Sequence, residues 1–356
     1  MQSAPGLIAL FGSGETSLAG GRVFESLAQG LPRSLRIAIL ETPAGFELNS
    51  AQVAGRVADF LRARLQNYTP VVEVVPARKR CTAFSPDDIS ILTPLLRANL
   101  IFMGPGSPTY AVRQLRGSLA WDLLRARHRL GATLVFASAA TIAIGTRALP
   151  VYEIYKVGED VTAPPGLDLF ADFGLSLSCI SHWNNAEGGA DLDTSRCFIG
   201  RERFEAWTKL LPPEQTIVGL DEHTALMMDF AAGKCCVDGV GGLTVRRSSE
   251  EHVFPGDMTF PMTELGAFHL PESLEEGIPA QAWEMAKNAP PPESENEEIP
   301  AEVQQLVEER QQARACQDWA AADELRRRIA ALGWQVQDTP QGSKLMREDK
   351  TQESSF

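Results

Sequence analysis

Three segments that lie far apart in the sequence place a hydroxyl, an imidazole and a carboxylate directly after short apolar runs. Such runs, rich in β-branched residues, are typical of buried strands. A serine hydroxyl becomes a nucleophile when a base takes its proton, and the base needs a carboxylate that fixes its tautomer. The sequence therefore contains the residue types of nucleophilic catalysis at predicted strand ends. They are Ser138 after residues 133–136, His182 after residues 177–181, and Asp221 and Glu222 after residues 216–220.

Ser138 stands where a predicted strand turns directly into a helix of small residues, 139–145. A sharp turn of this kind exposes the hydroxyl and directs the helix N-terminus at it, which is the geometry of a nucleophile elbow. A serine that opens a helix more often only caps it. The segment alone leaves catalysis and capping open, and the two later strand ends favour catalysis.

His223 is the alternative to His182 as the base, because it follows Glu222 directly. Neighbouring side chains on an extended segment face opposite ways, so only one of Glu222 and His223 can point at Ser138. We favour His182 and keep His223 as the alternative.

Predicted strands and helices alternate through the first part of the chain. The alternation predicts an α/β fold, a three-layer α/β/α arrangement with a mostly parallel sheet and helices on both faces. In such sheets the active crevice lies beyond the C-terminal ends of the strands, where we expect the residues named above to meet. The predicted strands are 7–11, 35–40, 71–75, 99–103, 133–136, 177–181 and 216–220, and the predicted helices include 51–65 and 87–96.

Four short motifs form a pattern over roughly residues 7–245. They are Gly-Ser-Gly-Glu at 12–15, Met-Gly-Pro-Gly-Ser at 103–107, Ser-Ala at 138–139, and Gly-Leu-Asp-Glu-His-Thr-Ala-Leu at 219–226. The pattern resembles the serine peptidases that include dipeptidase E and cyanophycinase, which share the class I glutamine amidotransferase-like fold.

The resemblance implies a serine-type hydrolase of a small peptide or related acyl bond, with a peptide or amino-acid-derived substrate and neither cofactor nor metal. Carried over, Ser138 is the nucleophile, His182 the general base and Glu222 the group that orients it. The backbone N–H groups of Gly106 and Ala139 would form the oxyanion hole.

The elbow departs from the family pattern. The family usually has Gly-Thr-Ser-Ala-Gly where residues 136–140 read Phe-Ala-Ser-Ala-Ala, and we expect Phe136 to narrow the pocket. The altered elbow keeps open the alternative of a catalytically inactive relative that binds a ligand or a protein partner.

A dense polar segment follows His182 in the sequence. Its members Asn184, Asn185, Glu187 and Arg196 are candidates for binding a small polar substrate, with the arginine pairing with a carboxylate. The alternative interpretation is a solvated surface loop.

Composition excludes several functional classes. The formal charge of -13 repels phosphate backbones and anionic membranes, so nucleic acid and membrane are not expected partners. No signal peptide and no stretch long enough to cross a bilayer is visible, which predicts a cytoplasmic protein. The six cysteines show no metal-binding spacing, so we expect neither a metal site nor a disulfide framework.

The chain divides into four predicted parts: a peptidase-like α/β domain at 1–270, an acidic proline-rich linker at 271–300, a helical hairpin at 301–346 and a disordered tail at 347–356. The hairpin resembles the extreme C-terminus of cysteinyl-tRNA synthetases. The His-Ile-Gly-His and Lys-Met-Ser-Lys-Ser signatures of those enzymes are absent from the sequence.

Between residues 301 and 350 there are eight Lys or Arg against nine Asp or Glu, so the part that resembles a synthetase lacks the positive field expected of a tRNA-binding segment. Docking or contact within a homo-oligomer is at least as good an interpretation of this part as tRNA binding, and a tRNA-associated adaptor is kept as an alternative.

Overall fold

The computed structural model describes residues 4–32, 34–247, 250–289, 301–316, 318–339 and 342–347. The chain forms two compact units, Met1–Ala289 and Pro290–Phe356. Each unit is considered by itself. Among the described residues, no helix combines the length and the apolar character that crossing a membrane requires.

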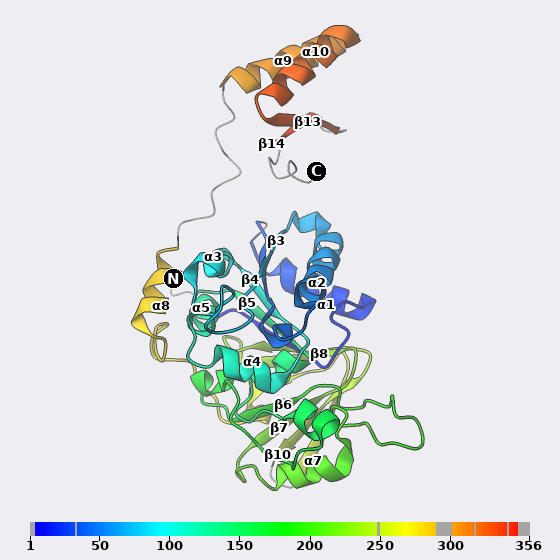
Figure 1. Ribbon diagram of the computed structural model, residues 1–356, viewed down its shortest axis with the longest axis vertical. Coiled ribbons are helices and arrows are strands. Elements are labelled where there is room, and N and C mark those ends of the chain that lie inside the picture. The colour runs from blue at the N-terminus through cyan, green and yellow to red at the C-terminus, as the bar shows by residue number, and fades with distance from the viewer. Residues whose placement is uncertain are drawn as a thin grey trace. The chain divides into compact units, whose positions relative to one another are not determined.

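An eight-stranded sheet forms the centre of the first unit (Figure 1). Five neighbouring strands run parallel, and three strands at one edge are added in antiparallel orientation. The order across the sheet is β12 (Thr259–Pro261), β9 (Lys234–Gly239), β8 (Thr224–Asp229), β1 (Ile8–Phe11), β5 (Thr133–Ala137), β4 (Leu100–Met103), β2 (Arg36–Leu40) and β3 (Val71–Val75).

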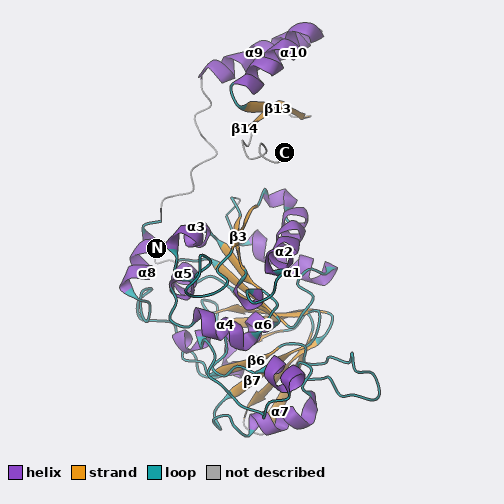
Figure 2. Cartoon of the chain, viewed as in Figure 1, coloured by secondary structure: helices purple, strands orange, loops and turns teal. Residues whose placement is uncertain are grey.

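Helices cover both faces of this sheet because successive strand residues alternate between two hydrophobic cores. Phe11 and Phe102 pack with α1 (Leu18–Gln29) and α2 (Ser50–Arg64). The neighbouring residues Leu10, Ile101 and Phe136 pack on the other face. Helices α3 (Ile89–Arg97), α4 (Pro108–Leu115) and α5 (Leu119–Arg129) lie there. Figures 1 and 2 show the two helical layers, which confirm the predicted three-layer α/β fold.

Two of the predicted strands belong to a second, four-stranded sheet in the same unit. Its order is β11 (Glu250–Pro255), β10 (Gly242–Arg247), β7 (Thr216–Leu220) and β6 (Leu177–Ile180), with only β6 and β7 parallel. The sequence analysis expected β6 and β7 to end at the rim of the main sheet. An apolar run shows that a strand is buried but not which sheet it joins, so this assignment needed the structure.

Residues 221–223 connect the two sheets, since β7 ends at Leu220 and β8 of the main sheet begins at Thr224. The Gly12 N–H, after β1, donates to the Thr224 carbonyl at 2.9 Å. The His182 N–H, after β6, donates to the Gly12 carbonyl at 3.1 Å. The ends of β1, β6 and β7 therefore meet, although they come from different sheets.

Shorter helices and α7 (Gly200–Thr208) complete the first unit. Helix α8 (Ala280–Lys287) lies within the stretch predicted as linker, 271–300, and buries Ala282, Trp283 and Ala286. The first unit therefore continues to Ala289, and residues 290–300 lie outside the described residues. The shorter helices are η1 (Thr42–Ala44), η2 (Gln66–Tyr68), α6 (Ala139–Ala143), η3 (Glu153–Val157), η4 (Leu169–Phe173) and η5 (Met262–Leu265).

The second unit consists of two helices and a strand hairpin. Helices α9 (Ala301–Ala315) and α10 (Trp319–Ala331) lie where a helical hairpin was predicted. Strands β13 (Trp334–Thr339) and β14 (Gly342–Arg347) pair antiparallel after them and were not predicted. Apart from Arg347, the predicted disordered tail at 347–356 lies outside the described residues. The core of the unit contains Val303, Leu306, Ile329 and Val336.

Candidate active site

Ser138 occupies a strained turn between β5 and α6. Its backbone has φ 51° and ψ −112°, which lies outside the regions that residues with a side chain prefer. Within residues 132–145 every other residue is buried, and Ser138 alone is half-buried. Strained backbone of this kind is concentrated at functional sites, where the surrounding structure maintains it.

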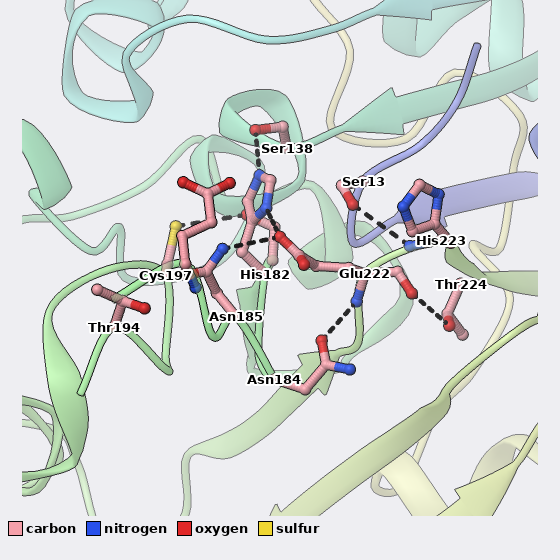
Figure 3. A network of polar contacts seen from close by, with 12 residues as sticks. Ser13, Ser138, His182, Asn184, Asn185, Thr194, Cys197, Glu222, His223 and Thr224 are labelled. Atoms are coloured by element: carbon pink, nitrogen blue, oxygen red, sulfur yellow. Dashed lines mark hydrogen bonds and ion pairs between the residues drawn. The ribbon is translucent and has the colours of Figure 1, made fainter. Parts of the chain in front are cut away.

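The side chains of Ser138, His182 and Glu222 form one hydrogen-bonded row (Figure 3). The Oγ atom of Ser138 is 3.0 Å from Nε2 of His182, and Nδ1 of His182 is 2.9 Å from Oε1 of Glu222. The His182 and Glu222 side chains are 17% and 28% exposed. The structure thus brings together the three residues that the sequence analysis selected from separate strand ends.

The histidine is fixed through its backbone. His182 has a left-handed φ of 50°, and its carbonyl accepts hydrogen bonds from the N–H groups of Asn185 at 3.2 Å and Cys197 at 3.1 Å. Together with the hydrogen bond from the His182 N–H to the Gly12 carbonyl, these contacts connect the His182 backbone to neighbouring segments of the chain. They thereby fix the position of the imidazole.

Glu222 is held by two asparagines. Asn185 Nδ2 donates to Oε1 of Glu222 at 3.0 Å, and Asn184 Oδ1 accepts the Glu222 N–H at 2.8 Å. Burial opposes the charge of Glu222, but the hydrogen bonds from His182 and Asn185 lower the pKa of this carboxyl overall. Of the two asparagines predicted to bind substrate, Asn185 therefore contacts the carboxylate of Glu222 and Asn184 contacts its backbone. Glu187 is exposed, and its N–H donates to Asn185 Oδ1 at 3.2 Å.

His223, the alternative base, turns away from Ser138 (Figure 3). Its N–H donates to the Ser13 Oγ at 3.3 Å, and its ring lies against Gly14. A Cβ on Gly14, whose φ is +72°, would come within 2.2 Å of the His223 Nδ1, so a glycine is required there. His182 is therefore the imidazole hydrogen-bonded to Ser138.

Gly106 and Ala139 each present a backbone N–H that no described acceptor takes up. The loop that carries Gly106 contacts the first turn of α6, because the Ala140 N–H donates to the Gly104 carbonyl at 3.3 Å. Gly106 has φ +142°, and a Cβ there would come within 2.0 Å of the Pro43 carbonyl oxygen. An oxyanion hole requires two N–H donors of this kind, and Ala139 directly follows Ser138.

Two sequence expectations fail at the edge of the site. Arg196, predicted to pair with a substrate carboxylate, stacks on Trp183 with 3.7 Å between the guanidinium carbon and the ring centroid. Its Nη1 atom donates to the Trp183 carbonyl at 2.9 Å, so this cation is already engaged. Phe136, predicted to narrow the pocket, is fully buried in the core of the sheet.

The sequence analysis missed two neighbours of His182. The ring of Phe198 lies 5.4 Å from the His182 ring, measured between centroids, after three successive residues with left-handed φ at 196–198. No sequence signal marks this turn, since it contains no glycine.

The second neighbour of His182 is Glu15, which is half-buried. Burial raises the pKa of its carboxyl, although His182 and His223 are close enough to act in the opposite direction.

Among the residues with described positions, no group of His, Cys, Asp and Glu is arranged to hold a metal ion. The six cysteines are unpaired.

Comparison with solved structures concerns the first unit. The structure of a peptidase from an acI-B1 Actinobacterium aligns with a TM-score of 0.58 at 18% identity, over 73% of this chain and 98% of that one. The structure of a putative peptidase E protein from Listeria monocytogenes EGD-e aligns with a TM-score of 0.41 at 15% identity, over 69% and 100%. The first alignment shows that the two proteins share a fold.

Comparison with known sequences concerns the second unit. Residues 296–344 match the family described as the cysteinyl-tRNA ligase anticodon binding domain. The cysteine–tRNA ligase of Methanosarcina mazei is 46% identical over 55 residues, which are 15% of this chain and 12% of that ligase. The match thus spans about an eighth of the relative's length. The predicted resemblance of this part to the C-terminus of cysteinyl-tRNA synthetases is confirmed.

Proposed function

We propose that the first unit is a serine-type hydrolase that cleaves a small peptide or related acyl bond through an acyl-enzyme. The observation that carries the proposal is the continuous row from the Ser138 Oγ through the His182 imidazole to the Glu222 carboxylate. The strained elbow at the nucleophile, and the contact of α6 with the loop that carries Gly106, support the same chemistry.

Acylation begins when the Ser138 Oγ attacks the substrate carbonyl carbon and its proton passes to the His182 Nε2. The Glu222 carboxylate accepts a hydrogen bond from the Nδ1–H of the resulting imidazolium and stabilises its positive charge. The N–H groups of Gly106 and Ala139 donate to the oxyanion. When the tetrahedral intermediate collapses, the carbonyl–nitrogen bond breaks and His182 gives its proton to the leaving amine.

Deacylation repeats these steps with water as the nucleophile. The His182 Nε2 takes a proton from the water as its oxygen attacks the ester carbonyl. The ester bond to the Ser138 Oγ then breaks, the proton returns to the serine, and the carboxylic acid leaves.

Labelling by a fluorophosphonate tests the proposal, because the probe reacts with an activated serine. We expect the wild-type chain to be labelled, Ser138→Ala to lose the label, and Ser85→Ala, at a half-buried position in the loop before α3, to retain it. An unlabelled wild type under conditions that label a known serine hydrolase would instead favour the catalytically inactive, ligand-binding relative.

For the second unit we propose contact with tRNA. The family match over residues 296–344 and the similarity to the Methanosarcina mazei ligase favour this candidate. We expect the full chain to retain tRNA on a filter with a salt-dependent affinity, and a chain lacking residues 300–356 to lose it. Equal retention by both chains would argue against the proposal and leave docking to a protein as the role of this unit.

A further inference from the structure

Four aromatic side chains, which we call the aromatic wall, lie along the candidate site. They come from three segments: Phe46 from the loop after η1, Tyr152 and Tyr155 from the residue before η3 and from its middle, and Phe198 from the loop after β6. Phe46 is 47% and Tyr155 41% exposed, so both present apolar surface to solvent.

One end of the wall contacts the base. The Phe198 ring is 5.4 Å from the His182 ring, and the Tyr155 ring is 5.8 Å from that of Phe198, each measured between centroids. An acyl group attached to Ser138 would therefore have aromatic surface beside it on the His182 side.

The other end of the wall reaches the loop of the proposed oxyanion hole. The Phe46 ring lies 6.4 Å from the Tyr152 ring and 5.1 Å from that of Tyr110. Tyr110 belongs to the first turn of α4, directly after Gly106 and Ser107. The wall thus consists of two ring pairs, one beside the base and one beside α4, which the segment 152–155 connects along the chain.

Hydrogen bonds fix the wall to that loop. The Thr109 Oγ1 donates to Oε1 of Glu153 at 2.5 Å and lies 3.0 Å from the Ser107 Oγ. Because Glu153 is the neighbour of Tyr152 in the sequence, this chain of contacts holds η3 against α4. The aromatic surface is therefore rigid relative to Gly106, as a specificity surface requires.

The middle of the wall combines a neutral phenol with one cation, the Lys156 ammonium, which is 4.6 Å from the Tyr152 ring centroid. Burial raises the pKa of the Tyr152 hydroxyl, and the nearby Glu47 and Cys197 raise it further, so the phenol stays neutral. Arg196, which could have attracted an acidic side chain, is engaged by Trp183.

We propose that the aromatic wall selects substrates whose acyl part carries an apolar, preferably aromatic, side chain. This inference rests on the proposed hydrolase function, and it names the substrate class for that site. Flat apolar groups gain both area burial and ring contacts against such a surface.

Diphenyl esters of α-aminoalkyl phosphonates test this preference. The Ser138 Oγ would form a bond to phosphorus, the bond to one phenoxide would break, and the serine proton would pass to the His182 Nε2. We expect the second-order labelling rate of the phenylalanine analogue to exceed that of the aspartate analogue by roughly 10- to 100-fold. A faster aspartate analogue would overturn the inference, and would point to Lys156, whose ammonium is 4.6 Å from the Tyr152 ring centroid.

Tyr155→Ala supplies the matched variant. Because Tyr155 is exposed and is no part of the hydrogen-bonded row, we expect the variant to fold and its phenylalanine-to-alanine rate ratio to fall roughly 5-fold or more. Tyr68→Ala, in η2 before β3 at the opposite edge of the sheet, should leave the ratio unchanged. An unchanged ratio in Tyr155→Ala would overturn the inference.

The failure of this inference is distinguishable from that of the hydrolase proposal. A chain that reacts with a simple fluorophosphonate but shows no apolar preference retains the function and loses the inferred substrate class. A chain that reacts with neither probe loses both.

Discussion

The backbone of Ser138 has a conformation that glycine adopts more easily than any residue with a Cβ. Replacing the serine by alanine removes the hydroxyl and keeps the Cβ, whereas replacing it by glycine removes both. We expect the free energy of unfolding, measured in urea, to be about 1 kcal/mol higher for Ser138→Gly than for Ser138→Ala, because glycine relieves the strain. Neither variant should react with a fluorophosphonate. Equal stability of the two variants would show that the turn stores no strain.

The charge of Glu222 makes the free energy of unfolding depend on pH. Hydrogen bonds lower its pKa in the folded state below the ordinary value of 4.5, so its charged form favours folding. This contribution is fully present above the unfolded-state pKa and is lost as the pH falls through the folded-state pKa. We therefore expect the difference in unfolding free energy between wild type and Glu222→Gln to be constant from pH 7 down to about 4.5 and to shrink below it. A difference that grows on acidification would contradict the assignment.

Sequence reasoning identified the members of the row but not the residues that hold it. Ser138, His182 and Glu222 stand directly after buried runs, and this position is visible in the sequence. Asn185 follows His182 just as plainly, yet its hydrogen bond to Glu222 joins residues 37 apart in the chain. The sequence shows that the Asn185 side-chain amide needs a hydrogen-bond partner, but only the structure shows that this partner is Glu222.

At the scale of elements, the short connection from β7 to β8 decides where Glu222 lies. Because β7 belongs to the second sheet and β8 to the main sheet, residues 221–223 cross between them and carry the carboxylate to the end of β6. The parallel pair β6 and β7 then places His182 beside Glu222. The candidate site is thus built where two sheets meet, with the nucleophile from one and the base from the other.

The packing of β7 against the segment after β6 offers a test of this arrangement. A Cβ on Gly219 would come within 2.3 Å of the Trp183 ring, which directly follows His182. We expect Gly219→Ala to lower the unfolding free energy by about 1–3 kcal/mol and to slow fluorophosphonate labelling, because the displaced ring moves the imidazole. The comparison is Gly55→Ala in α2, where a Cβ meets nothing within 4 Å. That variant should be as stable as wild type or more so, and fully reactive. Labelling that is unaffected in Gly219→Ala would show that Trp183 does not position His182.

Most of the strands that sequence analysis predicted are completely buried. Strands β1, β4, β5, β6 and β7 have every residue buried, and their sequences are mainly apolar. Strand β11 has five exposed residues of six, and its sequence, Glu-Glu-His-Val-Phe-Pro, has no such pattern. Helix α8 is two turns long, too short for a helical period to stand out, and its burial depends on the contact with α5. Strand β11 and helix α8 both depend on contact with a neighbouring element, which the local sequence does not encode. For this reason sequence analysis did not predict them.

At the scale of the whole molecule, the chain combines two units with separate cores and different relatives. The first unit has two extensive cores, one on each face of its sheet. The second has a single small one. A core of this size stabilises a domain only weakly, so a single substitution should unfold the second unit. The separation of the cores predicts that the chemistry of Ser138 does not depend on the second unit being folded.

Ile329→Asp in the full chain tests that independence. Ile329 is fully buried in the core of the second unit, and a carboxylate there has no partner to offset its loss of hydration. We expect α9 and α10 to become sensitive to protease, tRNA retention to be lost, and fluorophosphonate labelling of Ser138 to continue at the wild-type rate. Leu332→Asp, at a position 43% exposed, should leave all three properties unchanged. If labelling is lost together with the second unit, the two units depend on each other for stability or for activity, and the hydrolase site would have to be sought in the complete chain rather than in the first unit alone.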